Sequence, residues 1–185
     1  SVTNDSVIRS EMIVDEGDPF SKLLVNKSIN NLKGRGIFGK VEHKVLPGSS
    51  DDLKVLEVSV EEKATGEIMA GAGIGTDGTS FQFAIKENNW LGRGIKLQSD
   101  LNVTEQKVSG NISINNPNYN YSGNSVSVGL DVSSTDRSST TGFTSSRTGF
   151  SLGTGFEQYE NLYLSPRLDI AFEDIEVDAG ASEQI

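Results

Sequence analysis

Apolar and polar residues alternate one by one through most of this chain, from about Thr65 to Phe172, in segments of about ten residues. Successive side chains of a β-strand point to opposite faces, so each segment predicts a strand with one apolar and one polar face. The alternation is clearest at Ile95, Leu97, Leu101 and Val103, at Val126, Val128, Leu130 and Val132, and at Leu162, Leu164, Leu168 and Ile170. Several such strands in series, with almost no helical pattern between them, are typical of the wall of a transmembrane β-barrel.

Seven strands are predicted in this region, separated by small polar turns or by loops that carry aromatic residues. Their ranges are 67–75, 79–89, 94–104, 107–115, 124–134, 143–156 and 161–173. The apolar positions keep their phase across several turns, as a continuous antiparallel meander requires. The opposite face carries charges such as Lys96, Asp100 and Arg167, which lipid would not tolerate, so we expect this face to line a water-filled interior.

Composition agrees with a wall that has water on one side. Only 35% of the 185 residues are hydrophobic, which is a low share for a globular protein, and no stretch is apolar for long enough to form a transmembrane helix. The net charge of −10 argues against nucleic acid as a partner, because phosphate binding requires a basic surface. Cysteine is absent and His43 is the single histidine, so we expect no cofactor, no metal site and no enzymatic activity.

The first 64 residues follow a different pattern and predict a separate domain. The predicted order is a short helix up to Met12, a second helix that ends at Gly34 or Gly36, and strands over 37–46 and 53–62. Asp18 would cap the second helix, because Pro19 suits a first helical position. That helix would carry an apolar stripe of Phe20, Leu24, Val25, Ile29 and Leu32.

Aromatic residues gather in alternate connections between the strands predicted after residue 64. Trp and Tyr favour the headgroup region of a bilayer, so we interpret this pattern as an aromatic girdle at one membrane interface. The alternative interpretation is that these side chains stabilise their turns. The proposed girdle consists of Trp90, Tyr119, Tyr121, Tyr159 and Tyr163.

Five short motifs follow one another along the chain: EGDPF at 16–20, EEKATG at 61–66, GAGIGTDG at 71–78, ENNWLGRG at 87–94 and NNPNY at 115–119. In this order and spacing they resemble the BamA-like outer-membrane protein assembly factors, which combine POTRA domains with a bacterial surface-antigen barrel. The resemblance covers nearly the whole chain. One departure is Asn118, which precedes Tyr119 in the last motif and alters the turn expected there.

The resemblance implies a mainly β fold with two parts. Residues 1–64 would be the last POTRA domain, an α+β unit of order α-α-β-β whose first strand is missing. Residues 65–185 would be the N-terminal part of the barrel, with about seven antiparallel transmembrane strands. The chain begins with Ser1 and shows no leader, so we expect an internal piece of a longer protein. The implied location is the outer membrane of a Gram-negative bacterium, with residues 1–64 in the periplasm.

The implied function is the insertion of β-barrel proteins into the outer membrane without ATP. The partners implied are unfolded outer-membrane proteins, accessory assembly lipoproteins and outer-membrane lipid. The first barrel strand would act as a lateral gate that pairs with a client strand, since glycine weakens a strand and exposes its backbone. Close packing inside the barrel is the alternative explanation for these glycines. The gate would consist of Glu67, Ile68, Met69, Ala70, Gly71, Ala72, Gly73, Ile74 and Gly75.

Three other functions remain open at this point. A two-partner secretion or autotransporter-assembly translocase of the same superfamily would have the same parts. A passive outer-membrane channel would lack the helix–helix–strand–strand domain that residues 6–62 predict. A soluble all-β adhesin would need a second sheet to cover its apolar rows, and the sequence offers no such complementary face.

Overall fold

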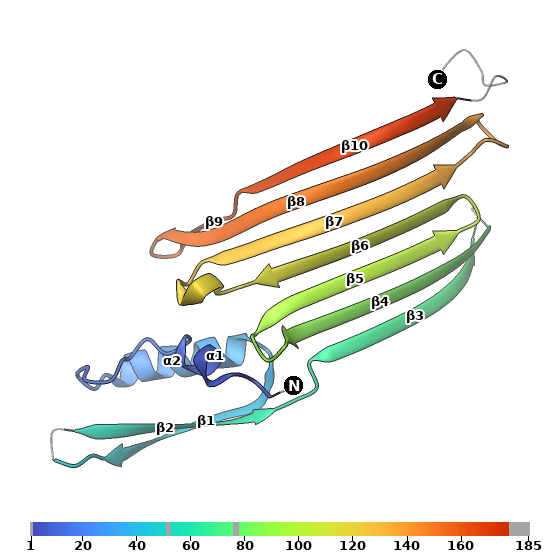
Figure 1. The fold of residues 1–185 in the computed structure, drawn as a ribbon. Helices are drawn as coiled ribbons and strands as arrows, with labels where there is room; N and C mark the ends of the chain where they lie inside the picture. Colours follow the sequence, from blue (N-terminus) through green and yellow to red (C-terminus); the bar gives the residue numbers. More distant parts are fainter. Residues whose placement is uncertain (1, 51–52, 76–77, 178–185) are drawn as a thin grey trace. The chain divides into compact units, whose positions relative to one another are not determined.

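The computed structural model describes residues 2–50, 53–75 and 78–177, which form two compact units (Figure 1). The first unit comprises the described residues up to Thr65 together with 88–95, and the second comprises 66–87 and those from Lys96 onward. The predicted turn at Thr76 and Asp77 lies outside the described residues.

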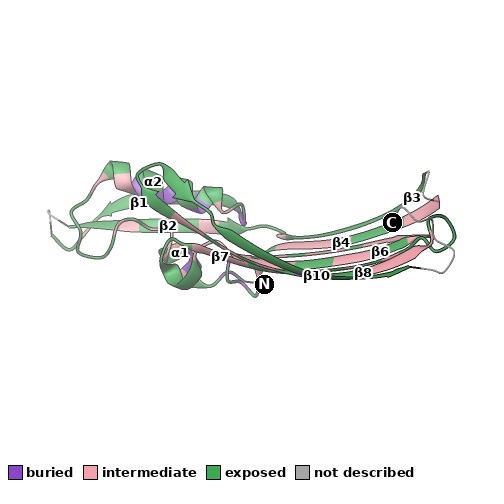
Figure 2. Cartoon of the chain, turned by 90° about the horizontal axis from the view of Figure 1, so that it is seen from above, coloured by how far each residue is buried: buried purple, intermediate pink, exposed green. Residues whose placement is uncertain are grey.

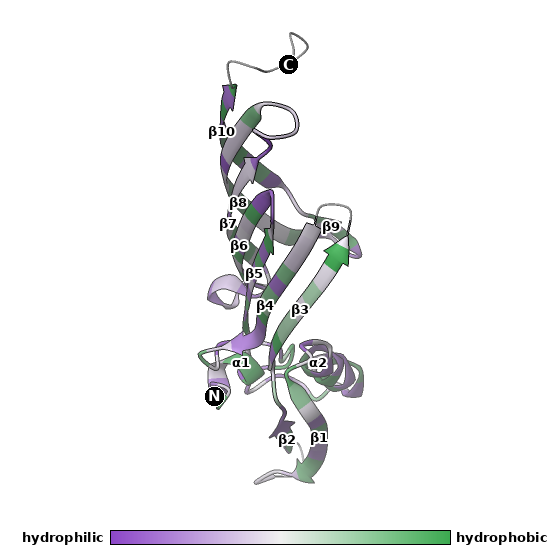
Figure 3. Cartoon of the chain, turned by 90° about the vertical axis from the view of Figure 1, so that its right-hand side faces the viewer, coloured by the Kyte–Doolittle hydropathy of each residue, from purple (hydrophilic) through white to green (hydrophobic). Residues whose placement is uncertain are grey.

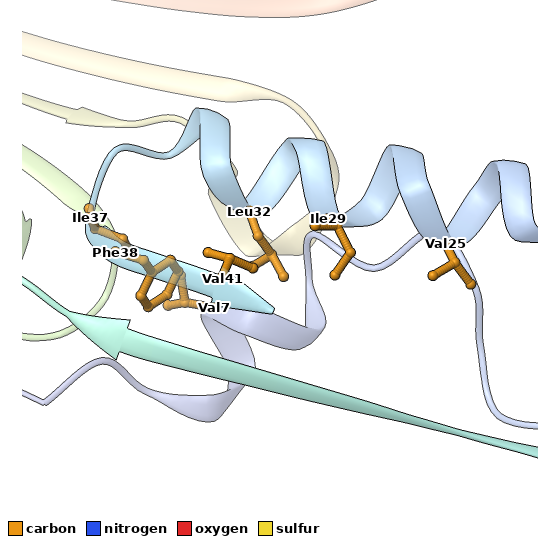
Figure 4. Close-up of a cluster of buried hydrophobic side chains, with 7 residues drawn as sticks. All are labelled: Val7, Val25, Ile29, Leu32, Ile37, Phe38 and Val41. Atoms are coloured by element: carbon orange, nitrogen blue, oxygen red, sulfur yellow. The ribbon is translucent and has the colours of Figure 1, made fainter. Parts of the chain in front are cut away.

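The first unit contains two helices and a two-stranded antiparallel sheet, in the predicted order helix, helix, strand, strand. Their bounds are Asp5–Arg9 for α1, Lys22–Gly34 for α2, Phe38–Pro47 for β1 and Lys54–Glu62 for β2. One face of α2 packs against the sheet and α1, and Leu32 is completely buried there. Figure 4 shows the buried cluster, which consists of Val7, Val25, Ile29, Leu32, Ile37, Phe38 and Val41.

Both predicted helix boundaries near the start of the chain need correction. Helix α1 ends at Arg9, where the Ser10 hydroxyl donates to the carbonyl of Val7 (2.9 Å) and so favours a tighter turn. Helix α2 begins at Lys22, not at Pro19, because Ser21 is the N-cap and its Oγ accepts a hydrogen bond from the N–H of Leu24 (3.4 Å).

The other predicted cap residue serves a turn before α2. The carboxylate of Asp18 accepts from the N–H of Asp15 (3.0 Å), and Gly17 supplies the positive φ of 99° that this turn requires. Phe20 consequently lies outside α2 and is half exposed, so it does not belong to the apolar stripe.

The second unit is a single antiparallel sheet in which strands follow their order in the chain, β3 to β8 and then β10 (Figure 1). The seven predicted strands are confirmed, except that the last is divided by Ser165 and Pro166 into β9 and β10. The bounds are Gly66–Gly75 (β3), Gly78–Trp90 (β4), Ile95–Thr104 (β5), Lys107–Asn116 (β6), Ser125–Asp136 (β7), Phe143–Tyr159 (β8), Leu162–Leu164 (β9) and Arg167–Val177 (β10).

The strand register sorts apolar and polar side chains onto opposite faces of this sheet. One apolar row crosses five strands without interruption: Leu97, Ile114, Val128, Leu152 and Leu168. The neighbouring row, on the other face, is Gln98, Ser113, Gly129, Ser151 and Asp169. Figure 3 shows hydrophobic and hydrophilic segments following one another along strands such as β10. The sheet therefore has the one apolar and one polar face that the sequence predicts.

The apolar face is open in the part of the chain that the structure describes. Leu152 is 45% exposed and Leu168 is 57% exposed, whereas all buried hydrophobic residues that the structure describes lie in the first unit (Figure 2). A soluble sheet would cover such rows with a second apolar layer. Exposed rows opposite a charged face are the arrangement expected for a sheet that meets lipid on one side.

Candidate functional site

Strand β3 is the end strand of the sheet and is the candidate site for strand exchange. It pairs with β4 from Gly66, opposite Glu87, to Gly75, opposite Gly78. No other described strand pairs with it, so among the described residues its second edge presents unpaired N–H and C=O groups. Such an edge is a template for another strand.

The two faces of β3 differ in what they present. The register places Ile68, Ala70 and Ala72 opposite Ile85, Phe83 and Phe81, so these residues continue the apolar face. The alternate positions lie on the polar face: first Glu67 and Met69, and then glycine at 71, 73 and 75. All nine predicted gate residues therefore lie on this one edge strand: Glu67, Ile68, Met69, Ala70, Gly71, Ala72, Gly73, Ile74 and Gly75.

The described surroundings do not require glycine on the polar face of β3. A Cβ added at Gly71 or Gly75 would meet nothing within 4 Å, and one added at Gly73 would meet only the flexible Ser80 hydroxyl at 3.2 Å. None of the three has a positive φ. What glycine does contribute is backbone freedom, because each one weakens a strand by about 0.5–1 kcal/mol relative to alanine.

The proposed girdle residues lie in alternate connections of the sheet. Tyr119 and Tyr121 belong to a short 3-10 helix, η1 (Tyr119–Tyr121), between β6 and β7. Tyr159 ends β8 and Tyr163 lies in β9, and all four tyrosines are more than half exposed. Trp90 is half-buried and belongs to the first unit. Their role at a membrane interface stays a prediction.

The departure at Asn118 has a structural explanation. Its side-chain oxygen accepts from the N–H of Gly123 (2.8 Å), and its own N–H donates to the Asn116 side chain (3.1 Å). These bonds close the loop around residues 120 and 121, both of which have positive φ. The polar residue thus forms a closed turn by hydrogen bonding.

A groove in the first unit is a second candidate site. Its volume is about 780 Å³, and it runs between α1, the loop before α2 and strand β2. Its apolar lining includes Met12, Phe20, Val55 and Leu56, and the charges of Arg9 and Glu16 lie at its wall.

Two ionisable groups of the first unit are perturbed. Burial lowers the pKa of Arg35, and the Glu11 carboxylate 3.4 Å away partly opposes that shift. The pKa of Glu62 is lowered because its carboxylate accepts a hydrogen bond from the backbone N–H of Thr3. Both groups form internal contacts of the fold, and neither is part of a catalytic arrangement.

Chemical catalysis has no visible centre in the described ranges. They contain no group of three or more His, Cys, Asp or Glu residues that could hold a metal ion, and His43 is exposed on β1. None of the helices in these ranges is both long and apolar enough to cross a membrane.

The chain matches two family models. Residues 89–185 match the Omp85 superfamily domain, and residues 1–63 match the POTRA model, described as a surface antigen variable number repeat. These two matches follow each other along the chain in the order that the motifs predict.

Several curated proteins are similar to the chain. A putative outer membrane protein assembly factor of Treponema pallidum is 30% identical over 142 residues, which are 73% of this chain and 17% of that protein. The outer membrane protein assembly factor BamA of Neorickettsia risticii is 35% identical over 103 residues, 54% of this chain and 13% of that protein. The chain thus spans less than a fifth of either relative.

A solved structure matches nearly the whole chain. The crystal structure of BamA from Haemophilus ducreyi lacking POTRA domains 1–3 has a TM-score of 0.76 and 26% sequence identity, and covers 95% of this chain and 34% of that one. The BamA-like resemblance is therefore confirmed in sequence and in fold.

Proposed function

The chain belongs to the Omp85 superfamily, and from this premise we propose that the protein inserts β-barrel proteins into the outer membrane. It lies in the bacterial outer membrane, with residues 1–64 in the periplasm. The relatives are named outer membrane protein assembly factors. Unfolded outer-membrane proteins would be its clients, and accessory lipoproteins and outer-membrane lipid its further partners.

The observation that carries this proposal is the edge strand β3. It pairs with β4 and is rich in glycine on its polar face, at positions where a side chain would fit. An incoming client strand would pair with the other edge of β3 by main-chain hydrogen bonds. These bonds are worth more in lipid than in water, because a bilayer offers no alternative partner for a backbone N–H or C=O.

Insertion under this proposal needs no chemical step. The client strand would pair with β3, its apolar side chains would join the lipid-facing rows, and its polar side chains would face water. The free energy would come from burying apolar surface in lipid and from satisfying backbone groups. The glycines would keep the native pairing of β3 weak enough to be exchanged.

A photo-crosslinking experiment tests the contact directly. A photoreactive residue replaces Met69 on β3 of the full-length protein in membranes that are inserting a client. The matched control carries it at Ser127, on the polar face of the interior strand β7. We expect client adducts from position 69 and none from 127. Equal adducts at both positions, or none at 69 during active insertion, would refute a role for β3 in client pairing.

A tether tests whether the strand must open. These 185 residues contain no cysteine, so none of them competes with an engineered cysteine pair. A disulfide between β3 and the strand that closes the barrel against it should abolish client insertion, and reduction should restore it. The control pair, Met69→Cys with Ala84→Cys, joins β3 to its directly paired partner β4 and should leave insertion intact. Unchanged insertion by the first disulfide would contradict gating, and a passive channel would insert no client in any variant.

A further inference from the structure

The end of β4, the turn that follows it and the first residue of β5 belong to the first unit, although the rest of both strands lies in the second. These residues, 88–95, cover most of the ENNWLGRG motif, whose residues the proposed function does not use. Asn89, near the end of β4, is only 2% exposed, which is unusual for an amide side chain. A buried amide side chain is expected to have hydrogen-bond partners inside the protein.

The side chain of Asn89 links distant parts of the chain. Its Nδ2 donates to the hydroxyl of Thr3 (2.8 Å), which is itself buried, and its Oδ1 accepts from the N–H of Gly94 (2.7 Å). The N–H of Thr3 donates to the carboxylate of Glu62 at the end of β2. Thr3 therefore contacts both Glu62 in the sheet of the first unit, through its N–H, and Asn89, through its hydroxyl.

Backbone contacts reinforce the same junction. The N–H of Asn4 donates to the carbonyl of Gly92 (2.8 Å), and Nη2 of the largely buried Arg35 donates to the carbonyl of Gly94 (3.3 Å). A Cβ at Gly92 would lie 2.1 Å from the carbonyl oxygen of Val2, and both glycines have positive φ. The approach of the two chain segments is thus possible only with glycine at this position.

We propose that Asn89 is a positioning residue that permanently fastens the turn 88–95 into the periplasmic unit. The first unit is then joined to the sheet at three chain crossings, 65/66, 87/88 and 95/96, instead of one. Residues 88–95 therefore fold with the first unit, although the strands that they join, β4 and β5, lie mostly in the second.

Amide hydrogen exchange of the full-length protein tests the fastening without any insertion assay. We expect the amides of Asn4 and Gly94 to be as protected as those of α2 in the wild type. Thr3→Val keeps the shape but removes the acceptor of Asn89, and should speed exchange at Asn4 and Gly94 by roughly five- to a hundredfold. Thr3→Ser restores the hydroxyl and should restore protection. Asn30→Ala, at an exposed position of α2, is the matched control and should change nothing in the turn.

Two results of that experiment would overturn the proposal. One is wild-type exchange in 88–95 as fast as in the exposed turn 137–141 between β7 and β8. The other is unchanged protection in Thr3→Val. Either result leaves the proposed role of β3 untouched, because it concerns only the turn.

A disulfide tests whether the fastening is permanent during function. Thr3→Cys with Asn89→Cys replaces the pair of side chains whose Oγ1 and Nδ2 lie 2.8 Å apart with two thiols that oxidation can join. We expect client insertion by the full-length protein to continue with this disulfide formed. Insertion that stops on oxidation and returns on reduction would show that the turn must leave the first unit, and would overturn a permanent fastening. Of the two experiments, only this disulfide test relies on the proposed function, because it measures client insertion.

Discussion

Single residues decide whether the edge strand is strong or weak, and Gly71 is the most direct test. It has room for a Cβ and an ordinary φ. Gly71→Ala should therefore stabilise β3 by about 0.5–1 kcal/mol, because alanine allows the unfolded chain fewer conformations than glycine does. We expect the same substitution to slow client insertion. Gly110→Ala in the central strand β6 is the matched control, since its Cβ would be in ordinary contact at 3.7 Å from Val132.

The two measurements for this pair are unfolding by denaturant and the rate of client insertion. Both alanine variants should be more stable, but only Gly71→Ala should be slower. If both variants insert clients at the wild-type rate, the glycines of β3 have no role in strand exchange. If both are equally slow, the effect belongs to general stability and not to the edge.

Glu62 gives the first unit a defined response to acid. Its pKa is lowered in the folded protein by the N–H of Thr3, so this contact stabilises the fold above the ordinary carboxyl pKa of about 4.5. The contribution is lost as the pH falls below that value and through the folded pKa. Glu62→Gln should therefore lose less stability than the wild type as the pH falls below about 4.5, and the two proteins should converge in stability at the acid end. Parallel acid-unfolding curves would contradict this assignment.

At the scale of elements, the strands could be predicted because their signal is local. Val126 to Val132 alternate within one strand, and a strand needs nothing beyond that alternation to define its faces. The start of α2 could not be fixed in this way, because Asp18 and Ser21 are both good caps and the competing turn at Asp15 decides between them. The division of the last strand at Pro166 had a signal in the sequence, since proline cannot donate to a ladder.

The two faces of β7 should respond in opposite ways to the same charge. Val128→Arg places a guanidinium on the apolar face and should destabilise the full-length protein in lipid vesicles by about 2–4 kcal/mol near the middle of the bilayer. Ser127→Arg, the adjacent position on the polar face, should cost little, because water reaches it. Denaturant titration of the vesicle-bound protein measures both. Equal losses would mean that the apolar rows are not in lipid.

At the scale of the whole molecule, the residue that sequence patterns missed is Asn89. Its partner Thr3 is 86 residues away in the sequence, and helix or strand periodicity cannot predict a contact between residues so far apart. The motif's two glycines, Gly92 and Gly94, were visible, but their positive φ and their approach to Val2 and Arg35 appear only in the folded chain. The nine residues of the predicted gate, by contrast, are contiguous, and so the strand that contains them could be outlined from the sequence alone.

A client strand that paired with the outer edge of β3 would do so through main-chain groups, and main-chain groups are the same in every polypeptide. Recognition at this edge would consequently be indifferent to the amino-acid order of whatever docks there. A single strand could then serve many dissimilar substrates. Each would need only a segment in which apolar and polar side chains alternate, so that they match the two faces of the sheet. Selectivity among substrates would have to arise elsewhere in the machinery.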